Sequence, residues 1–163
     1  MTARAGSRWR VRLVALVRLV AAVSLLAVGA VHIQQYIVQY YRVIPTIGPL
    51  FLMNFIGGTV LGLYFLVPAR HCAGRVRLLV DAVAALAGWS VAAGALVALL
   101  VSEQTPLFGF MEHGYRFAIV FAIVSEAVAI VALTILLVDN RLRNPGARRS
   151  GTMPVVSVAD TTG

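Results

Sequence analysis

The sequence contains no lysine and little charge of either sign. Charged residues make up 12% of the 163 residues, whereas hydrophobic residues make up 60%. Soluble chains are roughly 45 to 50% apolar, so this composition argues against a soluble globular domain and favours an integral membrane protein.

Cysteine and recognisable catalytic motifs are also scarce. Cys72 is the only cysteine, which excludes a disulfide within the chain and any CxxC redox or zinc pair. The chain has no nucleophile elbow, phosphate loop, zinc-protease helix or haem-attachment motif. The sequence therefore predicts no cofactor and favours a non-enzymatic protein.

Long apolar runs dominate the sequence. A bilayer core of roughly 30 Å requires about 20 residues per helix, and four runs are long enough: 13–34, 47–69, 78–101 and 117–138. The first run exceeds the length of roughly 7 to 15 residues that is usual for the hydrophobic region of a signal peptide. Continuous runs without alternation form helices in lipid rather than a barrel, so we expect an all-α, four-transmembrane-helix bundle.

All fourteen basic residues are arginines, and their positions predict the topology. Eleven lie before the first run, between the second and third, or after the fourth, whereas only Arg42 and Arg116 lie in the other two connections. Arg18 lies inside the first run. The positive-inside rule then places both termini in the cytoplasm, and the net charge of +8 needs no nucleic-acid partner to explain it.

The chain divides into three parts on this basis. We expect a basic cytoplasmic N-terminus over 1–12, a transmembrane domain over 13–138, and a disordered cytoplasmic tail over 139–163, which lacks periodicity and apolar mass. The predicted location is the plasma membrane, which the chain crosses several times.

Glu126 is the most informative single residue, because it lies about ten residues into the fourth run, near the bilayer midplane. A carboxylate at that depth is costly and usually faces the bundle interior or a cavity. Two interpretations stay open. Glu126 is either a relay or ligand anchor, or a structural clamp that hydrogen-bonds a neighbouring helix.

His32 and Asn54 share the outer half of the bilayer with Glu126, so a packed bundle brings the three together in a candidate polar site. Glu112 and His113, in the second outer loop, are placed to join this site from above. Two histidines and carboxylates can bind a metal, but the residues have no recognisable ligand spacing. The sequence therefore predicts no metal site.

Small residues predict where helices pack closely. Gly58 and Gly62 form a GxxxG spacing in the second run, and Gly88 belongs to a stripe of small residues in the third. Such residues allow membrane helices to approach each other. We expect them to pack the helices of this chain and those of a membrane-protein partner or a second copy.

Two further features lie near the helix ends. Asp81, one turn into the third run, is predicted to form an ion pair with an arginine: Arg18, Arg75 or Arg77. After His32, apolar residues recur at helical spacing up to Ile44, which predicts an amphipathic extension of the first helix. Pro45 disfavours helix at Ile44 and ends the extension there.

One stretch of sequence resembles a recurring pattern in uncharacterised small four-helix membrane proteins of actinobacteria. It comprises His32, Tyr40, Arg42 and residues 44–54, followed by residues 107–112 and the pair Ser125-Glu126. The resemblance covers roughly residues 13 to 138 and implies a fold and a location rather than an activity. A looser similarity, in architecture alone, is to DoxX-like membrane proteins.

These observations favour a non-enzymatic membrane subunit or accessory protein. Two alternatives remain: a small proton- or ion-coupled transporter that uses Glu126, and a membrane redox component that binds a quinone or a metal. An open cavity that reaches Glu126 favours transport or ligand binding, whereas a dry helix seam favours packing.

Overall fold

The computed structural model describes residues 2–67, 74–106 and 117–143. These residues form four helices and one short 3-10 turn: α1 (Thr2–Val38), η1 (Tyr41–Val43), α2 (Ile47–Leu66), α3 (Arg75–Gln104) and α4 (Phe117–Arg143). No strand occurs in the described ranges. The prediction of an all-α, four-helix fold is confirmed.

Each α-helix is long and apolar enough to cross a membrane. The core is built largely from alanine, whereas large apolar side chains point outward. On α4, for example, Ala129 and Ala132 are buried, while Val131 is 60% exposed. Lipid covers such an outer surface without cost, so the fold is that of a multi-pass membrane protein.

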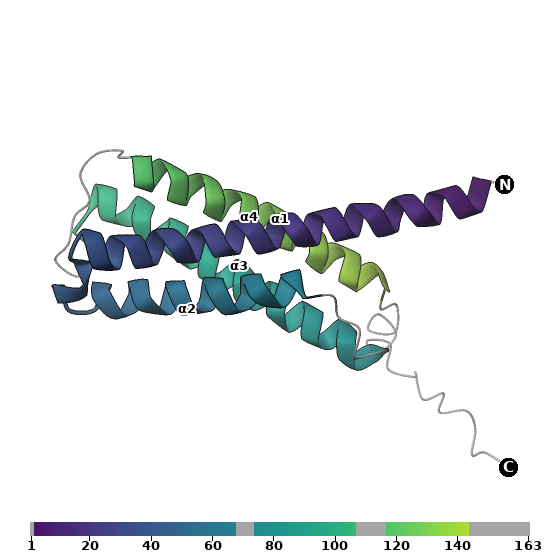
Figure 1. Cartoon of the computed structure of the whole chain (residues 1–163), viewed down its shortest axis with the longest axis horizontal. Helices are drawn as coiled ribbons and strands as arrows, with labels where there is room; N and C mark the ends of the chain where they lie inside the picture. Colours follow the sequence, from purple (N-terminus) through teal and green to yellow (C-terminus); the bar gives the residue numbers. More distant parts are fainter. Residues whose placement is uncertain (1, 68–73, 107–116, 144–163) are drawn as a thin grey trace, which may run out of the picture.

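The helices lie side by side as an elongated bundle (Figure 1). α1 packs along both α2 and α4, and α3 packs along α4, whereas the contact between α2 and α3 is smaller. α1 begins and α4 ends at the same end of the bundle, which we call the terminal end. The opposite end carries η1 and is called the η1 end.

Glycines set the close contact between α1 and α2. A Cβ added at Gly58 would lie 2.7 Å from the Leu25 carbonyl oxygen, and one at Gly62 would lie 3.0 Å from that of Ala22. Because these neighbours are backbone atoms, they cannot move aside. Gly88 of α3 instead faces side chains, those of Leu133 and Leu25.

The predicted extension of the first helix to Ile44 is wrong beyond Val38. Tyr40 adopts a left-handed conformation with φ of 59°, and η1 follows at once. The chain must reverse here to begin α2, and Tyr41 packs edge-on against Phe51 with ring centroids 5.0 Å apart. Ile44, before Pro45, is extended as predicted.

Polar contacts join the helices at the terminal end. Arg18 Nη1 donates to Asp81 Oδ1 over 3.0 Å, and the Tyr64 hydroxyl donates to the same oxygen over 2.8 Å. These contacts connect α1, α2 and α3, and they confirm the ion pair predicted for Asp81. Asp139 of α4 likewise pairs with two arginines, Arg10 and Arg143, at 2.8 and 2.6 Å.

Candidate functional site

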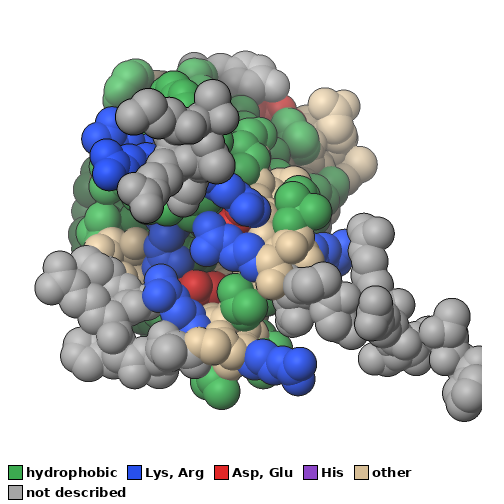
Figure 2. All heavy atoms as spheres, turned by 90° about the vertical axis from the view of Figure 1, so that its right-hand side faces the viewer, with side chains coloured by type: hydrophobic (Ala, Val, Ile, Leu, Met, Phe, Trp, Pro, Cys, Tyr) green, Lys and Arg blue, Asp and Glu red, His purple; other side chains and the backbone are tan. Residues whose placement is uncertain are grey.

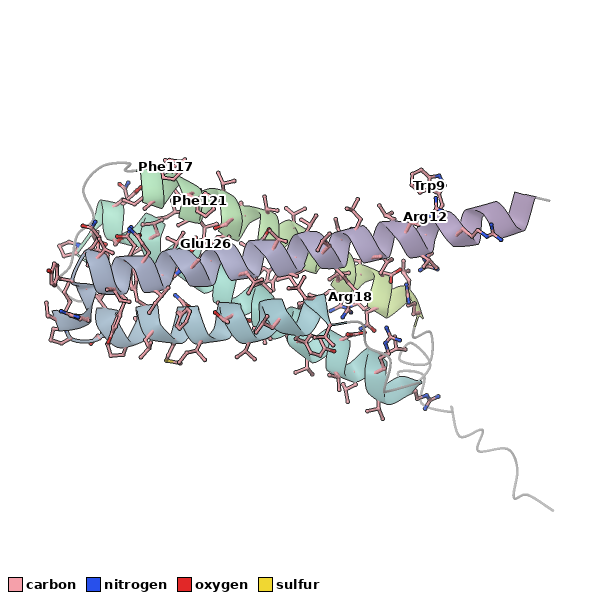
Figure 3. All side chains as sticks on the ribbon, in the orientation of Figure 1. Trp9, Arg12, Arg18, Phe117, Phe121 and Glu126 are labelled. Carbon is pink, nitrogen blue, oxygen red and sulfur yellow. The ribbon has the colours of Figure 1, made fainter. Side chains whose placement is uncertain are left out.

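Glu126 lies on the inner face of α4, in the half of the helix nearer the η1 end (Figure 3). Glu126 is only 1% exposed. Ala122 and Ala129, one turn away on either side, are buried and small, so the helix leaves room beside the carboxyl group. The Oε2 atom of Glu126 is buried and has no hydrogen-bond partner among the residues that the structure describes.

A cavity of about 310 Å³ adjoins Glu126. All four helices and η1 contribute to its wall, which lies in the half of the bundle towards the η1 end. His32, Asn54 and Glu126 all line this cavity. The structure thus brings the three residues of the predicted polar site together around one space, which we call the Glu126 pocket, while their function stays a prediction.

His32 is held in one orientation by its neighbours. Its Nδ1 lies 2.8 Å from the Val28 carbonyl oxygen, and a carbonyl only accepts, so Nδ1 carries the proton. The Nε2 atom of the neutral ring is therefore an acceptor. The imidazole also packs against Phe51, with ring centroids 5.0 Å apart, which fixes its position in the pocket wall.

Gln35 is a pocket residue that the sequence analysis missed. It is buried and lines the pocket. Its amide nitrogen donates to Gln34 Oε1 over 3.1 Å, while its own Oε1 is buried without a partner. Its position in the sequence could have indicated this role, because Gln35 follows His32 by three residues and therefore lies on the same helix face.

Two serines of α3 also line the pocket. Ser90 donates its hydroxyl proton to Leu86 over 2.9 Å, and Ser102 donates to Leu99 over 2.7 Å, in both cases to the carbonyl oxygen. Their remaining lone pairs are acceptors. No arginine is among the described residues that line the pocket, so none of these residues brings a fixed positive charge to its wall.

The pocket opens at the surface of α3 that carries Ser90 and Gly94. A Cβ added at Gly94 would meet nothing within 4 Å, and both Gly94 and Ser90 are exposed although they line the pocket. This part of α3 faces lipid in a membrane. The pocket is therefore accessible from the side of the bundle.

Two predicted residues cannot be placed. Glu112 and His113 lie outside the described residues, as does Cys72. Within the described part of the chain, no group of three or more histidine, cysteine, aspartate or glutamate residues is arranged to hold a metal ion.

Comparisons with protein-family models, with curated proteins and with solved structures found no match to this chain. The resemblance to small actinobacterial four-helix proteins therefore stays a prediction, and the function must be argued from the pocket itself.

Proposed function

We propose that this protein is a non-enzymatic accessory protein of the plasma membrane that binds a small amphiphilic molecule in the Glu126 pocket. One observation carries the proposal: the buried Oε2 of Glu126 has no partner and lies at the wall of a 310 Å³ cavity. An unsatisfied buried polar group costs roughly 1 to 3 kcal/mol. A ligand that hydrogen-bonds Glu126 removes this cost.

The pocket chemistry defines the ligand class. Most of the wall is apolar, and its polar groups include acceptors at Glu126, Gln35 and His32. A matching molecule has an apolar body and a head that donates hydrogen bonds, either an ammonium or a hydroxyl group. An ammonium head also pairs with the Glu126 carboxylate.

The clamp interpretation of Glu126 has less support. A clamp requires a hydrogen-bond partner on a neighbouring helix, and Glu126 Oε2 has none. A through-bundle transport path also lacks support, because the core closes on the terminal side of Glu126. There Leu25, Ala129 and Leu133 are all 0% exposed. Ligand binding from one side fits this geometry better than translocation.

The proposed orientation places both termini in the cytoplasm. Among the residues whose side chains are described, the terminal end carries arginines on α1, α3 and α4, whereas Arg42 lies at the η1 end. The positive-inside rule supports this orientation. The Glu126 pocket then belongs to the outer leaflet, and its ligand enters from there.

Three probes with one apolar body test the ligand class: 4-phenylbutylamine, 4-phenylbutanol and 4-phenylbutyrate. Binding to the purified protein in detergent is measured from the shift in unfolding temperature. We expect the amine and the alcohol to stabilise the protein and the anionic butyrate to have no effect. Equal stabilisation by all three would overturn the proposed chemistry.

A matched pair of variants tests the location. Gly94→Phe adds a ring at a position that lines the pocket and leaves Glu126 unchanged, whereas Val97→Phe adds the same ring to an exposed, 58% accessible position of α3 that does not line the pocket. We expect Gly94→Phe to abolish the shift caused by the amine and Val97→Phe to keep it. An unchanged shift in Gly94→Phe would show that the amine binds elsewhere.

A further inference from the structure

A second cavity lies at the terminal end and results from unequal helix lengths. α2 has 20 residues and α3 has 30, which at 1.5 Å per residue gives about 30 and 45 Å. Figure 1 shows α1, α3 and α4 continuing past the end of α2. They leave a cleft of about 600 Å³ beside Phe65, which we call the terminal cleft.

Arginines dominate the wall of this cleft. Four arginines and two aspartates line it: Arg18, Arg75, Arg77, Arg143, Asp81 and Asp139. Figure 2 looks onto the terminal end and shows arginine side chains gathered around acidic ones in the middle of this face. The cleft therefore has two more positive than negative charges.

The aspartates do not neutralise the remaining cations. Asp81 already accepts hydrogen bonds from Arg18 and Tyr64, and Arg77 approaches it only to 3.7 Å. Arg75 forms no ion pair with any residue in the described ranges. Arg18 also lines the cleft, and its Nη2 is buried with no partner among the described residues, so this guanidinium has an unsatisfied donor.

The guanidinium of Arg18 is also held in position. Its Cζ lies 5.2 Å from the centre of the Phe65 ring, a cation–π distance, and its Nη1 is fixed by Asp81. Apolar side chains complete the wall, among them Val14 and Leu136. The cleft thus combines one fixed guanidinium and further arginines with an apolar surface at the terminal end of the bundle.

We propose that the terminal cleft binds the headgroup of an anionic phospholipid. Arginine matches phosphate through paired N–H donors, and basic pockets between membrane helices are suited to anionic headgroups. The phosphate lies between Arg18, Arg75 and Arg77, and the glycerol and upper acyl chains lie against the apolar wall. This site is independent of the Glu126 pocket.

The test uses the purified full chain in detergent and compares phosphatidylglycerol with phosphatidylcholine of the same acyl chains. We expect phosphatidylglycerol to raise the unfolding temperature and phosphatidylcholine to leave it unchanged. Inorganic phosphate forms a third arm. If phosphate alone at millimolar concentration stabilises the protein as much as the lipid does, the site binds free phosphate and the lipid proposal fails.

Two double variants separate a defined site from general charge attraction. Arg75→Gln with Arg77→Gln removes two arginines from the cleft, whereas Arg8→Gln with Arg12→Gln removes two exposed arginines of α1 that do not line it. We expect the first pair to weaken phosphatidylglycerol binding roughly tenfold or more and the second to leave it nearly unchanged. Equal losses of phosphatidylglycerol affinity in the two double variants would overturn the proposal of a defined site. Circular dichroism verifies that both variants are folded.

Discussion

Arg18 and Glu126 show two different outcomes of burying an ionisable side chain. Arg18 has an ionic partner in Asp81 and lies over the ring of Phe65. Glu126 is more deeply buried, and its Oε2 has no partner in the described part of the chain. The first arrangement connects two helices, whereas the second leaves a local cost, which the proposed ligand would relieve.

Replacement of Glu126 by leucine is therefore expected to make the ligand-free protein more stable. In the ligand-free protein, Glu126→Leu should raise the free energy of unfolding by roughly 1 to 3 kcal/mol, because it removes an unsatisfied buried group. Thermal unfolding in detergent measures the change, with Glu126→Gln as the variant that keeps a polar group of similar shape. If Glu126 were a structural clamp, Glu126→Leu would instead lower the free energy of unfolding. A clear loss of stability in this variant would therefore contradict our interpretation.

His32 carries a prediction about a proton. The bond to the Val28 carbonyl requires the hydrogen on Nδ1, so the neutral ring should have an unprotonated Nε2. Nitrogen NMR of protein labelled at histidine distinguishes the two tautomers, and the spectrum of His32→Asn assigns the signal among the three histidines. A neutral His32 with its proton on Nε2 would be incompatible with the described pocket.

At the scale of elements, the helices were predictable because each is a long apolar segment with no alternative in lipid. The ends of the helices were less predictable. The sequence between His32 and Ile44 keeps helical periodicity, yet the helix stops at Val38 because the chain must turn back to begin α2. Local periodicity contains no information about that tertiary requirement.

The pocket was predictable only in part, for a related reason. Depth along each run placed His32, Asn54 and Glu126 in the same half of the bilayer, and all three line one cavity. The exposed positions of Ser90 and Gly94 in the pocket wall depend on side-chain packing across helices. No single segment encodes them, and Gln35 was missed because its amide looked interfacial.

Two glycines on different helices should respond oppositely to alanine. Gly58→Ala places a methyl group 2.7 Å from a backbone carbonyl oxygen, whereas Gly94→Ala meets nothing within 4 Å. We expect Gly58→Ala to lose roughly 1 to 3 kcal/mol of stability and Gly94→Ala to change it by less than about 0.5 kcal/mol. Thermal unfolding of both variants under the same conditions tests this. Equal losses would mean that α1 and α2 can separate to admit the methyl group.

At the scale of the whole molecule, the two ends of the bundle differ in chemistry. The terminal end is joined by ion pairs and exposes arginines, whereas the η1 end encloses the Glu126 pocket with a largely apolar wall. A lipid that binds the terminal cleft and a ligand that binds the pocket therefore occupy opposite leaflets. Their assignment to particular sides of the membrane depends on the orientation of the chain.

That orientation is tested by labelling single cysteines with a membrane-impermeant maleimide on intact cells. In a Cys72→Ser background, we expect Gln104→Cys, at the end of α3 nearest the η1 end, to react from outside. Gly6→Cys and Thr162→Cys should react only after the cells are broken, because the arginine distribution predicts that both termini are inside. Removing arginines from the terminal end, as in Arg75→Gln with Arg77→Gln, leaves most of this asymmetry and should not invert the pattern. If the two terminal positions were labelled on intact cells and position 104 were not, the bundle would be inverted, with the Glu126 pocket in the cytoplasmic leaflet and the terminal cleft facing outward.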